Sequence, residues 1–300
     1  MDYNPKFLDN IHIWSKEELE ILHKMKEDMP IEVFLNSTGD KGLVEAYGFD
    51  FIYTSAKIEG NTYDRYETLD LLDMGITAGG KKYSDALMIL NLKEVYRSIL
   101  NINYPINKNT LKEIHSIIAK DLVQRQNLGS MRKIDVQIGG STYKPLSTGD
   151  RLNAELDYLF KIYQTIDNPF NKALYIHHNL AYLQYFEDCN KRTARTMQFI
   201  SFKNDGIMPF IITNYEDSVY SQYRRTLVSY YEKGDYEPYK EFFMQNYKKI
   251  HQDLLRWQGI GIERDKPFKH TIPQTKPKEI SKKQSESIPK PQTKTKARRR

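Results

Sequence analysis

Apolar residues along most of the chain recur every three or four positions, which is the spacing of one face of an α-helix. The segment SKEELEILHKMKEDMP begins with Ser15 and Glu18 at the spacing of a capping box, and apolar residues follow through Met29. Thr110 and Glu113 have the same spacing. The pattern predicts an all-α fold with helices over 15–29, 41–58, 63–75, 84–101, 110–122, 150–166, 170–185, 190–204, 216–232 and 236–257.

One segment departs from the helical spacing. IDVQIGGSTYKPL, 134–146, alternates apolar and polar residues around Gly139-Gly140, which predicts a two-residue β-hairpin. A lone hairpin in an all-α protein has few strand partners and cannot form a core sheet. We therefore expect a surface hairpin with an open edge that an extended partner segment could join. A surface hairpin without such a role is the alternative.

Charge is distributed unevenly along the chain. The formal net charge is +6, yet residues 271–300 carry ten Lys and Arg against two Glu, and the remainder carries 35 basic and 37 acidic residues. The tail, 261–300, has almost no apolar residues, so we expect it to be disordered. This positively charged tail would bind nucleic acid or another polyanion. A tail that only solubilises the protein is the alternative.

The number of cysteines and the hydropathy of the chain indicate in which cellular compartment the protein resides. Cys189 is the sole cysteine, which excludes a disulfide framework and a cysteine zinc site, and fits a reducing cytosol. No stretch approaches the ~18 apolar residues of a membrane span. The start, MDYNPKFLDNIHIW, lacks the pattern of a secretory signal. We expect a soluble cytoplasmic protein that does not contact membranes.

The stretch FEDCNKRTAR, 186–195, predicts an anion-binding loop. It reads as a turn that runs into a helix near Asn190, and a helix start presents free N–H groups and the positive end of the helix dipole. Arg192 and Arg195 project from one side of that start and oppose the dipole unless an anion compensates them. Asp188 is placed for a cation that would bridge phosphate oxygens. A surface helix with solvated arginines is the alternative.

These residues resemble a known family. QYFEDCNKRTAR, 184–195, is similar to the Fic signature H-x-F-x-(D/E)-(G/A)-N-(G/K)-R-x-x-R. KIDVQIGGSTYKPL resembles the Fic flap, which pairs with a target segment as an added strand. Upstream, Ser55, Glu59 and Gly60 match an inhibitory motif of one class of Fic proteins, (S/T)-x-x-x-E-(G/N). ALYIHHNLAYLQYF, GIMPFI and GDYEPY also resemble Fic segments, so the resemblance covers roughly 30–250.

The resemblance implies a Fic-type helical bundle with a short β-hairpin flap that binds ATP and Mg²⁺. Asp188 would hold the Mg²⁺, and Asn190 with the adjacent backbone would cradle the α- and β-phosphates. Arg192 would contact the phosphates, and Arg195 would hold the γ-phosphate. Glu59 would pair with Arg195 and disfavour productive ATP binding, because a bidentate carboxylate competes strongly for a guanidinium.

The resemblance also implies an organisation in three parts. These are an N-terminal helical region, 1–80, with the inhibitory motif, a Fic core, 81–260, and the basic tail, 261–300. The core would contain the flap, 134–146, and the anion-binding loop, 186–195. An unknown target protein would dock on the flap through Ile138, Gly139, Gly140 and Tyr143.

Three positions depart from the commonest form of the signature. Gln184 replaces the histidine that takes the proton from the target hydroxyl, and an amide cannot act as a general base, a loss of about 10²–10⁴ in rate. Cys189 resembles the small alanine variant of the signature. Lys191 resembles the lysine variant, also found in Doc-type relatives that phosphorylate their target. Both would line the nucleotide site. We interpret His177, two helical turns before Gln184, as a packing histidine.

Three functions stay open at this point. The first is transfer of AMP from ATP to a target Ser, Thr or Tyr hydroxyl, restrained by Glu59 and impaired by Gln184, with Doc-like phosphoryl transfer as a variant. The second is an ATP-binding pseudoenzyme that binds a partner without transfer. The third is a binding protein whose basic tail docks on a polyanion. The retained phosphate residues favour ATP binding in the first two.

Overall fold

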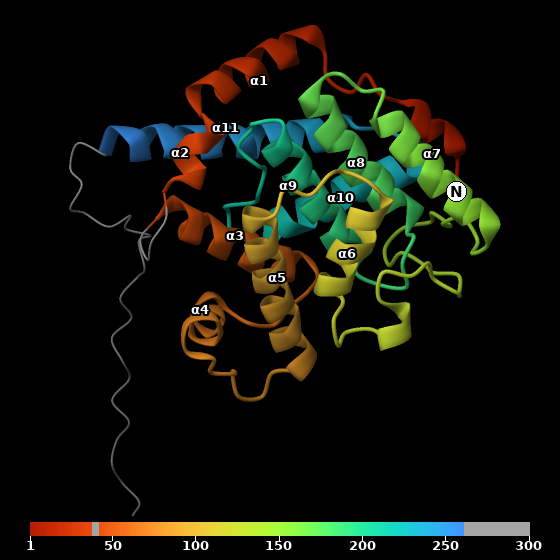
Figure 1. The fold of residues 1–300 in the computed structure, drawn as a ribbon, viewed down its shortest axis with the longest axis horizontal. Helices are drawn as coiled ribbons and strands as arrows, with labels where there is room; N and C mark the ends of the chain where they lie inside the picture. The colour runs from red at the N-terminus through yellow and green to blue at the C-terminus, as the bar shows by residue number, and fades with distance from the viewer. Residues whose placement is uncertain (38–41, 261–300) are drawn as a thin grey trace, which may run out of the picture. The chain divides into compact units, whose positions relative to one another are not determined.

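The described residues of the computed structural model, 1–37 and 42–260, are mostly helical, which confirms the predicted all-α class (Figure 1). Within these residues α2 is the one α-helix that the hydrophobic pattern did not predict. In chain order the elements are η1 (Pro5–Asp9), α1 (Lys16–Asp28), α2 (Ile31–Leu35), α3 (Leu43–Ile58), α4 (Arg65–Met74), α5 (Tyr83–Asn101), α6 (Lys108–Ile118), η2 (Arg125–Asn127), α7 (Asp150–Tyr163), α8 (Pro169–Leu183), α9 (Asn190–Asn204), α10 (Asp217–Lys233) and α11 (Glu237–Ile260).

Of the two predicted capping boxes, one forms. The Ser15 hydroxyl accepts from the Glu18 N–H at 3.2 Å, and the Glu18 carboxylate accepts from the Ser15 N–H at 2.8 Å. The prediction of a second capping box at Thr110 and Glu113 is wrong. The cap of α6 is Asn107, whose extended backbone (φ −155°) lets its amide oxygen accept from the Thr110 N–H at 2.9 Å. The helix therefore begins at Lys108, two residues before the predicted start.

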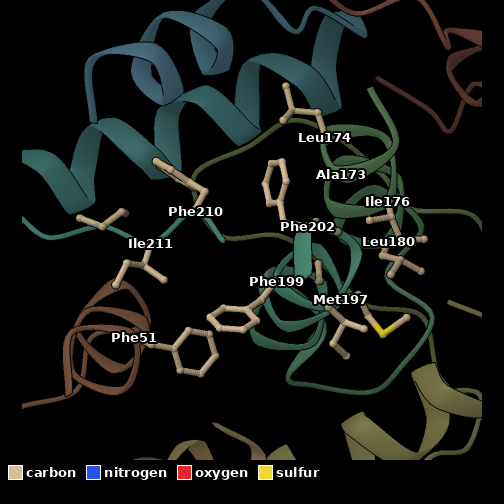
Figure 2. Packing of buried hydrophobic residues seen from close by; sticks show 14 of the residues in the cluster. Phe51, Ala173, Leu174, Ile176, Leu180, Met197, Phe199, Phe202, Phe210 and Ile211 are labelled. Atoms are coloured by element: carbon tan, nitrogen blue, oxygen red, sulfur yellow. The ribbon is translucent and has the colours of Figure 1, made fainter. Parts of the chain in front are cut away.

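α8 and α9 form the centre of the buried core. All α8 residues from Ala173 to Leu183 are buried, so this helix has no solvent face. Figure 2 shows Phe199 of α9 facing Phe51 of α3, with ring centroids 5.5 Å apart. Phe202, one turn further along α9, packs against Phe170 of α8 at 6.0 Å. Because both helices are enclosed, the loop that joins them has rigid support at both ends.

α3 packs against α5 and α10, and near its C-terminal end the Ser55 carbonyl accepts a hydrogen bond from Arg195 of α9. Gly48 permits the close approach to α5, since a Cβ there would lie 2.4 Å from the Tyr96 ring. The Tyr96 hydroxyl in turn donates to the Val44 carbonyl at 2.7 Å. At the other end, Glu59 is the C-terminal cap residue, and Gly60 follows with a φ of +84°, a left-handed conformation that favours glycine. The packing of α3 and its C-terminal cap therefore fix the position of Glu59.

The paired strands of the expected hairpin at 134–146 do not form, and that part of the prediction is wrong. The turn at Gly139 and Gly140 is present, but the described residues contain no strand, only an isolated parallel bridge between Asp2 and Lys144. The backbone of the second leg is engaged elsewhere, because the Lys144 N–H donates to the Met1 carbonyl at 2.7 Å and the Thr142 N–H to Glu232 at 2.9 Å. We keep the name flap for 134–146.

The predicted division of the chain at 80/81 stays a prediction. One hydrophobic cluster extends from Leu8 to Leu254 and includes residues on both sides of this boundary. The expected disordered tail, 261–300, lies outside the described residues. Among the helices that are described, none has the length and apolar character needed to cross a membrane.

Candidate functional site

The loop between α8 and α9 is shaped by residues in the left-handed conformation at both ends. α8 ends at Gln184 (φ 49°), and Cys189 (φ 62°) precedes the first residue of α9. Between them, the Asn190 side chain accepts from the Phe186 N–H at 2.9 Å and donates to the Phe186 carbonyl at 2.8 Å. Asn190 therefore shapes the loop, and its amide group still has a second N–H that these bonds do not use.

His115 of α6 supports the same loop, a contact that no sequence pattern indicated. Its ring stacks on Phe186 with centroids 3.7 Å apart. The Gly129 N–H donates to Nδ1 at 3.0 Å, which leaves the proton on Nε2 to donate to the Asp188 carbonyl at 3.2 Å. Burial lowers the pKa of His115 to about 4, so this tautomer is neutral. No local pattern marks a contact between residues 73 apart in sequence.

Cys189 fills a position that suits glycine. It is buried, with a left-handed backbone, and its N–H donates to the Asp188 carboxylate at 2.5 Å. Burial raises the pKa of the Cys189 thiol to about 12, so the sulfur is a packing group and not a nucleophile.

Substitution at Cys189 is expected to test this conformation. Cys189→Gly should change the free energy of unfolding by less than about 1 kcal/mol, because relief of the left-handed strain offsets the added freedom of the unfolded chain. Cys189→Val should lower it by about 2 kcal/mol or more, because a β-branched residue is poorly tolerated at positive φ. Urea unfolding of both variants measures the difference, and equal stability of the two would contradict the assigned conformation.

The start of α9 has the properties of an anion site. No side chain caps this helix, so the N–H groups of its first turn are left for another acceptor. Arg192 is only 5% exposed, and its Nε and Nη1 have no hydrogen-bond partner within the described residues. A cleft of about 170 Å³ opens at this point, lined by Glu59, Val136, Gln137, Ile138, Gly139, Gln184, Glu187, Asp188, Cys189, Asn190 and Lys191.

Glu59 already places a negative charge in this site. One carboxylate oxygen lies 2.9 Å from Nη2 of Arg195 and the other 3.3 Å from Nζ of Lys191. Burial alone would raise the pKa of Glu59, but the charges of Arg195, Lys191 and Arg192 outweigh it and lower the pKa to about 2. The expected contact between Glu59 and Arg195 is confirmed, but it is not bidentate, because the second carboxylate oxygen lies on Lys191 instead.

Two further groups hold Arg195 in place. Its Nη2 donates to the Ser55 carbonyl at 3.1 Å, so Ser55 contributes through its backbone and not its hydroxyl. The Arg195 guanidinium also lies over the Tyr223 ring, 5.6 Å from its centroid. Tyr223 in turn bonds to Nε2 of His177 at 2.8 Å. His177 is fully buried, and burial holds its pKa well below the usual value, which agrees with a packing role.

Gln184 lines the cleft, but its side chain is engaged. The side-chain amide nitrogen donates to the Ala181 carbonyl at 2.6 Å. The main-chain carbonyl of Gln184 accepts from Nε of Arg132 at 2.7 Å. The Gln184 side chain has no group that titrates near neutral pH.

The flap contributes to the cleft only in part. Ile138 and Gly139 line it, and a Cβ at Gly140 would meet nothing within 4 Å. Tyr143 is 3% exposed, stacks on Tyr182 with centroids 4.5 Å apart, and donates its hydroxyl to the Tyr182 carbonyl at 2.9 Å. Tyr143 therefore packs in the core and does not belong to a docking surface, contrary to the expectation.

Asp188 has the position and exposure of a residue that helps hold a cation. One oxygen accepts from the Cys189 N–H, the other lies 3.5 Å from Arg192, and the side chain is 63% exposed. The described residues contain no group of three or more His, Cys, Asp or Glu that could hold a metal alone. A single carboxylate beside an anion site fits Mg²⁺, which commonly takes one or two carboxylates together with phosphate oxygens.

Comparison with known proteins agrees with this geometry. Residues 105–200 match the Fic/DOC family. The protein adenylyltransferase Fic of Drosophila willistoni is 26% identical over 238 residues, which cover 78% of this chain and 46% of that protein. Its namesake from Culex quinquefasciatus is 26% identical over 267 residues, covering 84% and 50%. The chain thus spans about half the length of the curated relatives it matches.

Solved structures share the fold. Fic-1 from C. elegans is 18% identical with a TM-score of 0.66, over 83% of this chain and 73% of that chain. A Fic family protein from Desulfovibrio desulfuricans is 17% identical, also with a TM-score of 0.66, over 85% and 78%. Residues 105–200 therefore match the Fic/DOC family, and the described part of the chain shares the helical fold of these Fic structures.

Proposed function

We propose that this chain binds Mg-ATP at the start of α9 and acts as a protein adenylyltransferase, restrained by Glu59 and weakened by Gln184. The observation that carries the proposal is the Glu59 carboxylate, whose two oxygens lie on Arg195 and Lys191 beside an uncapped helix start. A site that holds a carboxylate with two cations suits the more highly charged phosphates of a nucleotide. Because the relatives are named protein adenylyltransferase Fic, we infer that the anion is the triphosphate of ATP.

Each residue of the site has a role in this proposal. Arg195 and Lys191, once released by Glu59, contact the terminal phosphates, and the unpartnered donors of Arg192 contact the inner ones. Asn190 keeps the loop in shape so that the backbone N–H groups of α9 face the phosphates. Asp188 holds the Mg²⁺, which supplies positive charge to the phosphate oxygens.

Transfer requires that a target hydroxyl attack the α-phosphorus and lose its proton. The first leg of the flap lines the cleft at Val136–Ile138, where an extended target segment would lie beside the phosphates. Gln184 accepts a hydrogen bond from the hydroxyl but does not remove its proton, so we expect slow transfer. The buried single cysteine is consistent with a cytoplasmic site of action.

Two observations keep alternatives in the proposal. The engaged amide of Gln184 favours an ATP-binding protein that binds its partner without transfer. Lys191 resembles the lysine variant that also occurs in Doc-type relatives, so phosphoryl transfer stays an alternative to adenylyl transfer. Attachment of the basic tail to a polyanion is compatible with all of these.

Parallel labelling with α- and γ-labelled ATP tests the proposal. The purified chain, and its Glu59→Gly variant, are incubated with cell lysate and each nucleotide in turn. We expect weak labelling that carries the α-label only, because adenylyl transfer keeps the α-phosphate. Incorporation of the γ-label instead would identify phosphoryl transfer. Binding of ATP with neither label incorporated, even in Glu59→Gly, would establish the non-catalytic alternative.

A further inference from the structure

Arg132 connects the loop after α8 to both legs of the flap. The residue is 2% exposed, and its Nε donates to the Gln184 carbonyl at 2.7 Å. Nη1 donates to the Ile134 carbonyl at 2.9 Å on the first leg, and Nη2 donates to the Leu146 carbonyl on the second. The Arg132 N–H also donates to the Tyr185 carbonyl at 3.0 Å. One guanidinium thus joins three chain segments.

Asp135 completes this arrangement from the solvent side. Its carboxylate lies 3.3 Å from Nη1 of Arg132, accepts from the Thr148 N–H at 2.9 Å and accepts from the Ser147 hydroxyl at 3.2 Å. The Thr148 hydroxyl donates back to the Arg132 carbonyl at 2.6 Å. These side-chain bonds close the flap in place of the strand pairing that does not form.

The chemistry of these bonds depends on arginine. Burial of a guanidinium is costly and lowers the pKa of Arg132, and the carbonyls and the carboxylate around it offset this cost by accepting its N–H groups. A planar fork with five donors spans several carbonyl groups at once, whereas a lysine ammonium is a single point. None of these bonds involves Asp188, Asn190, Lys191 or Arg195, the residues assigned to the nucleotide.

We propose that Arg132 and Asp135 form a clasp that sets the position of the flap relative to Gln184, and hence aligns a target segment with the nucleotide. The inference rests on the proposed function for its consequence in transfer, but the clasp itself is a property of the fold. Arg132 is a positioning residue: loosening it should impair the use of a target protein while nucleotide binding is retained.

Amide hydrogen exchange tests the clasp without reference to any activity. In Asp135→Ala, exchange is expected to be about tenfold faster at Thr148, which loses its acceptor, and also at Arg132, whose bond to Tyr185 depends on the clasp. Amides of α9 such as Thr193 should keep their rates. The control is Asp157→Ala, which removes an exposed carboxylate of α7 that is paired with Lys108 of α6. Faster exchange at Thr148 alone, or equally throughout α9, would overturn the clasp.

Transfer is tested with Arg132→Lys in a Glu59→Gly, Gln184→His background. Labelling of lysate proteins from α-labelled ATP should fall about tenfold, while Mg-ATP affinity by calorimetry stays within about twofold. If Arg132→Lys does not fold, Asp135→Ala takes its place, since that side chain is 64% exposed. Unchanged labelling, or a parallel fall in affinity, would overturn the positioning role. A background that does not transfer at all refutes the proposed function, and the exchange experiment still decides the clasp.

Discussion

Gln184→His in a Glu59→Gly background is expected to raise AMP transfer about a hundredfold over Glu59→Gly alone, on the scale of a restored general base. The structure favours the substitution because Gln184 has a left-handed backbone, φ 49°, which histidine tolerates better than most residues. The side chain lines the cleft that also contains Asp188 and Asn190, so an imidazole there would lie beside the phosphates.

Initial rates of α-label incorporation measure this effect. Gln184→Asn in the same background is the matched control, since it accepts the same backbone conformation but cannot take a proton. The gain should also depend on pH and fall below about 6.5 as the imidazole becomes protonated. A gain shared by asparagine would show that backbone strain, and not the missing base, limits the reaction. Rapid transfer by the unmodified chain would show that another group replaces the base.

Glu59→Gln is expected to raise the affinity for Mg-ATP about tenfold or more, since it removes two charge-assisted contacts that compete with phosphate. Gln retains nearly the same shape, so the change tests charge and not space. The contacts concerned join Glu59 to Arg195 at 2.9 Å and to Lys191 at 3.3 Å. Competition against a fluorescent ATP analogue measures the affinity, and Glu187→Gln, which neutralises another carboxylate lining the cleft, serves as the control.

The same carboxylate predicts a pH dependence. The pKa of Glu59 falls from 4.5 to about 2 on folding, so its stabilising contribution is present above about pH 4.5 and is lost as the pH falls toward 2. The Glu59 carboxylate should therefore be fully charged at both pH 5 and pH 8, and in the unmodified chain it should compete with phosphate for Arg195 and Lys191 equally at the two pH values. A marked rise in affinity on acidification to pH 5 would contradict this assignment.

Local patterns in the sequence predicted most of the helices and the turn that leads into α9, and anion binding at this turn stays a prediction. Helical spacing located α8 and α9, and the contact between Glu59 and Arg195 followed from a motif. The prediction of paired strands in the flap was wrong because alternation of apolar and polar residues shows which residues could form a strand. It does not show whether their backbone groups have other hydrogen-bond partners. Met1 and Glu232, far away in sequence, take those groups.

The support of the site could not be predicted in this way. His115 and Arg132 reach the loop from 73 and 52 residues away, and neither lies in a recognisable pattern. The burial of Tyr143 depends on stacking against Tyr182 of α8. Such contacts arise from how distant segments meet in three dimensions, whereas periodicity and spacing report only on neighbours along the chain.

Calorimetry of Mg-ATP binding to Glu59→Gly tests the central claim most directly. We expect a single site that binds Mg-ATP more tightly than in the unmodified chain, and we expect binding to be lost when Arg195→Ala is added, because the terminal phosphate then lacks its guanidinium partner. Circular dichroism shows whether both variants are folded. A folded Glu59→Gly variant that releases no heat with Mg-ATP and fails to compete for a fluorescent ATP analogue would contradict the assignment of a nucleotide site to the start of α9.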